Sequence, residues 1–464
     1  MPAASPADAA GTGAREIVAT LRAAGHEALW AGGCVRDHLL GRPAKDIDIA
    51  TSAHPDQVQA LFPVTHAIGR AFGVVLVEQA GATFEVATFR RDAGFTDGRR
   101  PDAVHFTTAQ VDAQRRDFTI NGLFLDPLTG QVHDYVDGRA DLERQVVRAI
   151  GNPADRFAED HLRMLRAVRF ATTLGFTLDP ATADAIRTQA TDLRRISAER
   201  IQLELIRTLT EARQAGQALA LLRETGLLPV FLPEVADLAG VEQPPEYHPE
   251  GDVFQHTVCM LDLMRNPTPE LALSVLLHDI GKPPTQRRVP LENGRERIRF
   301  DGHADVGARM AEVLLGRLRC SRALTEHVVT CVRDHMRFME VTRMRKATLR
   351  RLVMAPTFAT ELELHRLDCL GSHGHLDNYA FVRDFADTLK NEPMRPAPLL
   401  RGEDVMATGL TGPAIKPWLT AAYDLQLEGH LTTREQAINW LGQQRAASPD
   451  APPARPGPTG PAGS

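Results

Sequence analysis

The spacing of hydrophobic positions along the chain changes near residue 150. Before that point, short apolar runs alternate with polar and glycine-rich stretches. From Asp155 to Gln444, leucine, alanine, arginine and glutamate recur mainly at the three- and four-residue spacing of helices, with turns expected at 240–251 and 287–302. The pattern predicts an α+β fold, in which an N-terminal domain with a mixed sheet is followed by all-helical domains.

Before residue 150, individual helices and strands can be predicted from the spacing of apolar residues and from the glycines that interrupt it. A helix is expected over 14–24, a short strand over 27–31, a second helix over 34–40 that stops at Gly41, and a strand over 46–50. The runs 74–77 and 84–89 flank a turn-like segment and predict a hairpin. The stretch 93–102 is rich in glycine and arginine and is expected to be a loop.

Composition narrows the class of protein. The chain has 464 residues with 43% hydrophobic and 24% charged residues, which is typical of globular domains. No apolar run approaches the roughly 18 residues of a membrane span, and the first residues lack a secretory pattern. Five cysteines without a CxxC pair argue against a disulfide framework or a thiolate zinc site, so a cytoplasmic location is expected. The net charge of −6 disfavours polyanion binding over the whole surface, but a local basic track would suffice.

The sharpest chemical feature is Asp46-Ile47-Asp48. On a strand, residues two apart point to the same side, so both carboxylates project together while Ile47 packs behind them. Two acids this close repel each other unless cations lie between them, and Mg²⁺ prefers carboxylate oxygen. Glu85, in an apolar strand, is the best local candidate for a third acid. A two-metal site would activate an attacking hydroxyl and neutralise a leaving pyrophosphate.

Gly32-Gly33 lies between a predicted strand and a predicted helix, thirteen residues before Asp46. Glycines there let backbone N–H groups approach a phosphate, and the following helix N-terminus favours negative charge. Arg36 can reach the same phosphates, and Asp37 can hold its direction. Alone, Gly-Gly would indicate only a tight turn, but with the two acids it predicts a metal site that faces a triphosphate.

At this point the chain resembles a known family. The segment 32–51 (GGCVRDHLLGRPAKDIDIAT) is similar to motif A of class II tRNA nucleotidyltransferases and bacterial poly(A) polymerases, members of the polymerase β superfamily. The similarity continues in order through four further groups of residues, up to about residue 210. These groups are 115–122 (RRDFTING), 137–151, 157–170 (FAEDHLRMLRAVRF) and 196–201 (ISAERI).

The matched segments suggest nucleotide-binding roles. Arg115 and Arg116 are neighbours, so one can face phosphate while the other faces protein. Asp117 or Asn121 can hydrogen-bond a ribose hydroxyl.

Asp160 and Arg163 are three apart on a predicted helix and therefore expected on one face. The resemblance implies that this pair selects CTP and ATP without a template, and a surface ion pair is the alternative. Arg166 and Arg169 extend a cationic stripe on the same predicted helix, for phosphate, for tRNA or simply for solvent.

The segment 90–106 bears on specificity. In the family, a flexible loop here is needed to switch from C to A addition, and CC-only enzymes carry a deletion. The loop looks undeleted in this chain, which leaves full CCA addition and A-only addition open. A poly(A) polymerase fits less well, because the chain lacks a long basic C-terminal extension and 68–75 resembles the tRNA enzymes more closely.

A second cluster begins at His278-Asp279, which ends the apolar helix predicted over 271–277. With His256 upstream, the order resembles the HD phosphohydrolase domain, whose ligands map to His256, His278, Asp279 and Asp368. His303 and His335 match the extra positions of HD variants with more ligands. Imidazole with carboxylate suits Ni, Mn, Fe or Zn. Phosphatase or 2′,3′-cyclic phosphodiesterase activity is implied, and a retained structural domain is the alternative.

The resemblance implies five parts: a nucleotidyltransferase head (1–140), a helical neck (141–235), an HD domain (236–375), C-terminal helices (376–445) and a disordered tail (446–464). The expected partners are the tRNA 3′ end, CTP and ATP, with no membrane and no protein partner implied. Arginine-rich 343–346 and 350–351 are candidates for tRNA contact. An HD phosphohydrolase whose head is a tRNA-binding relic remains a competing hypothesis.

Overall fold

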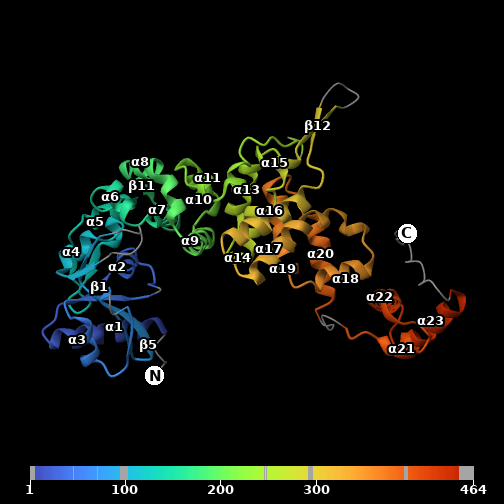
Figure 1. The fold of residues 1–464 in the computed structure, drawn as a ribbon, viewed down its shortest axis with the longest axis horizontal. Helices are drawn as coiled ribbons and strands as arrows, with labels where there is room; N and C mark the ends of the chain where they lie inside the picture. The colour runs from blue at the N-terminus through green and yellow to red at the C-terminus, as the bar shows by residue number, and fades with distance from the viewer. Residues whose placement is uncertain are drawn as a thin grey trace. The chain divides into compact units, whose positions relative to one another are not determined.

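A computed structural model of the protein describes residues 6–44, 46–69, 72–94, 103–244, 246, 248–290, 296–390 and 396–448. The chain forms two compact units, one of residues 1–239 with 314–320 and one of residues 240–313 with 321–464 (Figure 1). The first unit contains a seven-stranded sheet and helices, and the second is largely helical, so the predicted α+β fold is confirmed.

The seven-stranded sheet has the order β3-β4-β5-β2-β1-β8-β9. All its neighbouring strands are antiparallel except β2 and β5, which are parallel. Buried Phe84 and Val86 of β5 alternate with exposed Thr83 and Glu85, so one face of this strand packs into the core and the other opens toward solvent. The strands are β1 (Ala28–Ala31), β2 (Asp48–Thr51), β3 (Thr65–Gly69), β4 (Val74–Gln79), β5 (Ala82–Thr88), β8 (Leu123–Leu125) and β9 (Val132–Asp134).

The predicted hairpin of β4 and β5 and the two predicted N-terminal helices are confirmed. One detail of the prediction is wrong, because β2 begins at Asp48 and Asp46-Ile47 precede the strand. Two further strands, β6 (Arg90–Ala93) and β7 (Ala103–Phe106), pair with each other and flank the expected loop. Helices of this region are α1 (Pro6–Ala23), α2 (Gly33–Leu39), α3 (Pro55–Leu61), α4 (Ala109–Gln114), η2 (Thr119–Asn121) and α5 (Gly138–Arg144).

The rest of the first unit is helical, apart from the short parallel pair β10 (Val146–Val147) and β11 (Thr177–Leu178). The helix expected through 157–170 is interrupted: α6 ends at Glu159, Asp160 is extended, and α7 starts at Leu162. Its helices are α6 (Pro153–Glu159), α7 (Leu162–Leu174), α8 (Pro180–Gln189), η3 (Ala190–Arg195), α9 (Ala198–Glu211), α10 (Ala215–Glu224), α11 (Leu228–Phe231) and α12 (Pro233–Ala236).

In the second unit, the segment expected to be a turn at 287–302 contains an antiparallel hairpin, β12 (Arg287–Pro290) with β13 (Glu296–Arg299). The last helix runs to Ala447, two residues into the expected tail, and 449–464 lie outside the described residues. Its helices are α13 (Val253–Leu263), α14 (Pro269–Leu277), α15 (Lys282–Thr285), α16 (His303–Arg317), α17 (Arg322–Asp334), η4 (His335–Arg343), α18 (Lys346–Val353), α19 (Phe358–Gly371), α20 (Asp377–Thr388), α21 (Gly402–Met406), η5 (Gly412–Ala414), α22 (Ile415–Glu428) and α23 (Arg434–Ala447).

Candidate functional site

Gly32 forms the turn from β1 into α2, next to Ala31, whose partner on the neighbouring strand is Asp48. Its φ of +75° lies in the region that side chains rarely adopt. The backbone therefore favours glycine, and a Cβ at this position would lie 2.8 Å from Nη1 of Arg116, so this guanidinium would have to move. The absence of a side chain here lets the Arg116 guanidinium lie directly against the turn.

The predicted acids gather on the open face of the sheet. On one side of β2, Asp48 pairs with Ala31 of β1. On the other side, Ile49 pairs with Val86 of the parallel strand β5, so the preceding residues Asp48 and Glu85 lie side by side. Loss of hydration and the Asp46 carboxylate raise the pKa of Asp48, while Arg116 lowers it. Loss of hydration, and then the Asp48 carboxylate, raise the pKa of Glu85. The Asp46 carboxylate therefore opposes ionisation of Asp48, and Asp48 opposes ionisation of Glu85, so a bound cation would relieve this repulsion.

Arg115 and Arg116 share one carboxylate partner but make different further contacts. Both pair with the buried Asp112, whose carboxylate lies 2.7 Å from Nη2 of Arg115 and 3.1 Å from Nη2 of Arg116. Arg115 also donates to the Arg90 carbonyl, toward the β6 strand. Arg116 lies 4.9 Å from the ring centre of Phe124 and faces the Gly32 turn. Arg116 is thus the member of the pair that faces the acids.

A line of hydrogen bonds joins α2 to α7 through η2. Arg36 donates to Oδ1 of Asn121 over 2.7 Å, Asn121 donates to Asp117 over 3.0 Å, and Arg166 donates to Asp117 over 2.6 and 2.9 Å. Burial by itself would raise the pKa of Asp117, but Arg166 and then the Asn121 amide outweigh it and lower the pKa to about 2. Asp37 pairs with Arg36 at 2.8 Å, so it fixes the direction of that guanidinium.

The arginines expected to form a cationic stripe on α7 are placed differently. Arg169 is buried and pairs with Glu204 of α9 at 2.7 Å, while Arg166 is held by Asp117. Arg36, Arg166 and Arg169 all approach the ring of Phe170, with guanidinium carbons 5.1, 5.2 and 4.4 Å from its centre. Arg166 therefore connects α7 to Asp117, and Arg169 connects α7 to α9, instead of forming an exposed cationic stripe.

Asp160 and Arg163 do not share a helix face, because Asp160 lies between α6 and α7. The Asp160 carboxylate accepts two hydrogen bonds from Arg200 of α9, at 3.2 and 2.8 Å. Arg163 donates to Glu159 over 2.6 Å and to the Arg156 carbonyl over 2.9 Å. Each member of the predicted base-selecting pair thus has its own charged partner.

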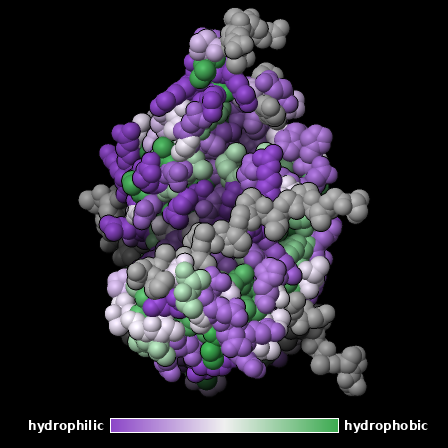
Figure 2. All heavy atoms as spheres, turned by 90° about the vertical axis from the view of Figure 1, so that its right-hand side faces the viewer, coloured by the Kyte–Doolittle hydropathy of each residue, from purple (hydrophilic) through white to green (hydrophobic). Residues whose placement is uncertain are grey.

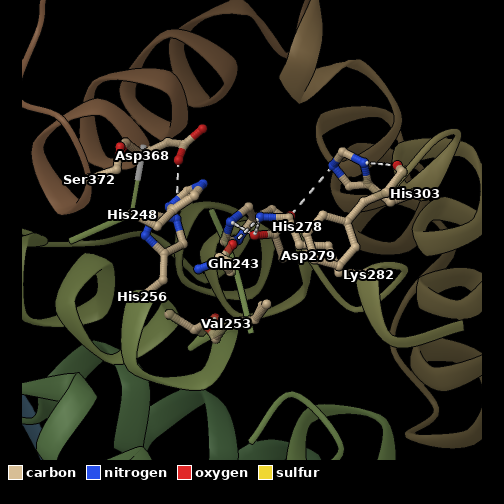
Figure 3. A network of polar contacts seen from close by, with 12 residues as sticks. Gln243, His248, Val253, His256, His278, Asp279, Lys282, His303, Asp368 and Ser372 are labelled. Atoms are coloured by element: carbon tan, nitrogen blue, oxygen red, sulfur yellow. Dashed lines mark hydrogen bonds and ion pairs between the residues drawn. The ribbon is translucent and has the colours of Figure 1, made fainter. Parts of the chain in front are cut away.

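In the second unit, four buried histidines, His256, His278, His303 and His335, converge from different elements, and Figure 3 shows the first three of them. Three of them donate Nδ1–H to the backbone carbonyl three residues earlier: His278 to Val275 over 2.9 Å, His303 to Phe300 over 2.8 Å and His335 to Val332 over 2.6 Å. Because a carbonyl only accepts, Nδ1 carries the hydrogen, and Nε2 is the atom of each ring left to bind a metal ion. The fourth, His256, has its Nδ1 at 2.6 Å from Glu250.

The Nε2 atoms face carboxylates and one another. Nε2 of His256 lies 3.1 Å from Asp368, and Nε2 of His278 lies 3.0 Å from Asp279. Nε2 of His303 and Nε2 of His335 lie 3.2 Å apart, beside Asp279. Lone pairs that face each other at these distances repel unless a cation or proton lies between them. The donor set fits a metal centre in two groups, His256, His278 and Asp368 on one side and Asp279, His303 and His335 on the other.

Three family models match separate parts of the chain. A poly(A) polymerase head domain matches residues 28–148, a probable RNA- and SrmB-binding site of polymerase A matches 175–238, and an HD domain matches 253–369. CCA-adding enzymes of Levilactobacillus brevis and Anoxybacillus flavithermus are 45% and 44% identical over 225 and 224 residues, which is 48% of this chain and 56% of each relative. The aligned region thus spans about half the length of these curated relatives.

The similarity to a solved structure extends further. The Bacillus stearothermophilus CCA-adding enzyme in complex with CTP aligns with a TM-score of 0.74 and 27% identity over 96% of this chain and 99% of that one. The chain thus matches a poly(A) polymerase head domain model in one segment and an HD domain model in another. Its resemblance to tRNA nucleotidyltransferases is confirmed. The Thermotoga maritima CCA-adding enzyme complexed with tRNA, at 19% identity and a TM-score of 0.57, shares the fold.

Within the poly(A) polymerase head domain, the segment expected to control the switch from C to A addition is only partly described. Its flanks form β6 and β7, and residues 95–102 lie outside the described residues. The same is true of Arg70 and Ala71, in the stretch that pointed to tRNA enzymes. No helix in the described part of the chain has the length and hydrophobicity needed to cross a bilayer.

Sequence reasoning missed several residues of the HD site. Glu250 accepts from His256 and also lies 2.9 Å from Nδ1 of His248, which had been given no role. Lys282 is buried, pairs with Asp279 at 2.7 Å and donates to Gln243 over 2.6 Å (Figure 3). The spacing of Lys282, three residues after Asp279 on one helical turn, was a usable signal. Glu250 and Gln243 come from the irregular segment before α13, where no period marks them.

Proposed function

We propose that the chain is a template-independent tRNA nucleotidyltransferase that adds CCA, or its terminal A, to tRNA 3′ ends from CTP and ATP. The observation that carries the proposal is the group of carboxylates Asp46, Asp48 and Glu85 beside Arg116 and the Gly32 turn. The CCA-adding relatives support the same reaction.

In this proposal, Asp46 and Asp48 hold Mg²⁺, with Glu85 as the third acid. When bound, the metal supplies Lewis-acid activation of the tRNA 3′-hydroxyl and charge neutralisation of the leaving pyrophosphate. The 3′-oxygen forms a bond to the α-phosphorus of the nucleotide as the bond to pyrophosphate breaks. The Arg116 guanidinium lies against the Gly32 turn and close to Asp48. It is the cation best placed to bind phosphate oxygens.

Base selection is proposed for Asp160 and Arg163. A carboxylate offers acceptors and a guanidinium offers donors, so together they can imitate the edge of a template base. The supporting geometry is the bidentate pair of Asp160 with Arg200, which leaves the direction of the carboxylate fixed. Asp117 and Asn121, held between Arg36 and Arg166, are proposed to set the ribose-facing wall of the site.

The deciding experiment offers three purified tRNAs to the full chain with CTP or ATP: one that lacks CCA, one that ends in the first C and one that ends in the second C. Completion of all three establishes full CCA synthesis, and addition to the last alone establishes an A-adding enzyme. Long runs of A from ATP on any RNA would favour a poly(A) polymerase. Incorporation into none of the tRNAs would refute the nucleotidyltransferase proposal.

A second function is proposed for the HD site: metal-dependent hydrolysis of phosphoesters at tRNA ends. The converging Nε2 atoms of His256, His278, His303 and His335 favour it, together with Asp279 and Asp368. Ni, Mn, Fe and Zn suit this donor set, and when bound such an ion supplies an activated water. Release of phosphate from a 3′-phosphorylated RNA tests this activity. Phosphate release without any nucleotide incorporation would support the relic-head hypothesis instead.

The five-part division of the chain also remains a proposal. Head, neck, HD domain, C-terminal helices and tail are assigned at 1–140, 141–235, 236–375, 376–445 and 446–464. Limited proteolysis followed by mass spectrometry tests the boundaries, because cleavage is expected first in exposed segments between folded parts. The cytoplasm is the proposed compartment, and a fluorescent fusion of the full chain tests it.

A further inference from the structure

The hairpin of β12 and β13 projects from the second unit and connects two parts of the HD site (Figure 1). It follows α15, which begins at Lys282, and it leads back into α16, which begins at His303. Lys282 contacts Asp279, and Nε2 of His303 lies 3.6 Å from the same carboxylate. Both ends of the hairpin are therefore anchored next to the candidate metal ligands.

The register of the hairpin gathers arginines on one face. Arg287 lies opposite Arg299, and Val289 lies opposite Arg297, so these four side chains share a face. The other face carries Arg288 opposite Ile298. All the arginines of the two strands are exposed, and in Figure 2 the hairpin region at the top of the view is mostly hydrophilic. We call Arg287, Arg297 and Arg299 the arginine face.

The two faces differ in how their charge is compensated. Arg288 pairs with Glu242 at 2.5 Å and lies 3.7 Å from Glu296. On the arginine face, Arg299 has one exposed pair with Asp301 at 2.9 Å, and neither Arg287 nor Arg297 has an ion pair among the described residues. Exposed pairs of this kind contribute little, so the arginine face keeps most of its positive charge.

This arrangement works against the hairpin's own stability. Like charges directly opposite each other destabilise an antiparallel pair, and Arg287 faces Arg299 in this way. A two-stranded ribbon is only marginally stable by itself. A polyanion along the arginine face would remove the repulsion. RNA presents a negative phosphate at each nucleotide, and guanidinium groups bind phosphate through paired hydrogen bonds.

We propose that the arginine face of the β12–β13 hairpin binds the phosphate backbone of an RNA strand and guides its end toward the HD site. The hairpin lies next to that site in the chain, because the helices before and after it begin at Lys282 and His303, which both lie beside Asp279. The delivery step rests on the proposed HD function, whereas RNA binding by the arginine face does not. The inference adds an RNA-contacting surface to the second unit.

The test compares two variants of the full chain that lose equal charge. One carries Arg287→Gln, Arg297→Gln and Arg299→Gln. The matched control carries Arg288→Gln from the opposite face with the exposed Arg322→Gln and Arg383→Gln. Binding of a 5′-fluorescein tRNA that lacks CCA is measured by anisotropy from about 0.05 to 0.2 M salt.

The arginine-face variant is expected to bind at least ~5-fold more weakly at low salt, and the slope of log K against log salt should shrink by about 2, since each phosphate contact to a single strand contributes about 0.7. The control should bind like the unmodified chain. Equal affinities for the arginine-face variant and the unmodified chain, or an equal loss in the control, would overturn the proposal. The single substitution Arg297→Gln is expected to lower the affinity for tRNA about 2-fold. It gives the same test while changing the hairpin less.

A second measurement separates this inference from the proposed HD function. Phosphate release is followed from a 3′-phosphorylated RNA and from p-nitrophenyl phosphate. In the arginine-face variant, kcat/KM for RNA should fall about as much as the affinity, while turnover of the small ester stays unchanged. If the unmodified chain releases no phosphate from either substrate, the HD proposal fails, and the anisotropy result still decides whether the arginine face binds RNA.

Discussion

Asp160 accepts hydrogen bonds from both terminal nitrogens of Arg200, at 3.2 and 2.8 Å, across the gap between the start of α7 and the start of α9. Arg163, its expected functional companion, turns instead to Glu159. The carboxylate proposed to recognise a base is therefore aimed by an arginine from a different helix. Base selection would depend on how α9 packs against α7 as well as on the α7 motif.

Arg200→Ala should loosen nucleotide selection, because Asp160 would lose the bidentate partner that fixes its orientation. We expect kcat/KM for the correct nucleotide to fall about 10-fold, the effect of one lost charged hydrogen bond, with incorporation of GTP or UTP becoming detectable. Competition among the four nucleotides on one tRNA measures this. Arg207→Ala, more exposed on the same helix, is the control. Unchanged selectivity in Arg200→Ala would show that Asp160 needs no such support.

Asp46→Ala or Asp48→Ala should abolish nucleotide incorporation, by at least ~10³-fold, because each removes a proposed ligand of the metal that activates the 3′-hydroxyl. tRNA binding should survive, since both side chains are exposed and neither has a hydrogen bond or ion pair with another described residue. Single-turnover incorporation and anisotropy are measured on the same preparations. Near-normal incorporation by either variant would refute the two-metal assignment.

Gly32→Ala should strongly reduce incorporation. The φ of +75° and the Arg116 guanidinium at 2.8 Å leave no unstrained place for a methyl group, so the turn or Arg116 must shift. We expect at least ~10-fold lower kcat/KM and a small fall in thermal stability. Gly442→Ala, a helical position with open space, should leave both unchanged. A fully active Gly32→Ala enzyme would contradict the placement of Arg116.

Asp117→Asn should destabilise the contact between η2 and α7 in a pH-dependent way. The folded pKa of about 2 lies below the ordinary 3.8, so Asp117 contributes stability that is fully present above pH ~4 and disappears as pH falls toward 2. At pH 7 the loss should be about 2 kcal/mol. Hydrogen exchange of peptides covering 117–121 and 162–170 measures it. The control is Asp184→Asn, which removes an exposed ion pair with Arg187 and should show no such pH dependence. An effect of Asp117→Asn that does not change with pH would argue against the ion pair of Asp117 with Arg166.

His278→Ala and Asp46→Ala should produce opposite losses. The first should remove phosphate release and leave nucleotide addition intact, and the second should do the reverse, because the two sites lie in separate units. Both reactions are assayed on one tRNA set with each metal tested separately. Loss of both activities from His278→Ala, in a protein that remains folded, would mean that the two reactions share a site.

The sequence predicted the positions of functional side chains correctly where these residues are only a few positions apart on one strand or helix. Gly32-Gly33, the acids at 46 and 48, and the histidines at helix ends all lie near the expected elements, because a strand or a helix fixes the spacing of neighbouring side chains. The β4–β5 hairpin followed from its own alternation for the same reason.

Contacts between residues that are far apart in the sequence could not be predicted from it. The partners Arg200 and Glu204 are separated from the residues they hold by at least one helix boundary, and no local period connects them. Asp112, in contrast, lies three and four residues before Arg115 and Arg116, a spacing that the sequence does show. Asp160 was assigned to a continuous helix, although its backbone is extended. The sequence predicts a turn where β12 and β13 form a hairpin, because arginines in place of alternating apolar residues conceal the strands.

The four histidine rings of the HD site are already held by Glu250 and by three backbone carbonyls. The rotational freedom that a metal ion would otherwise have to remove is lost when the chain folds. The site should therefore bind a metal ion without rearranging. A chelator that removes the ion should abolish phosphate release without unfolding the helices around the site.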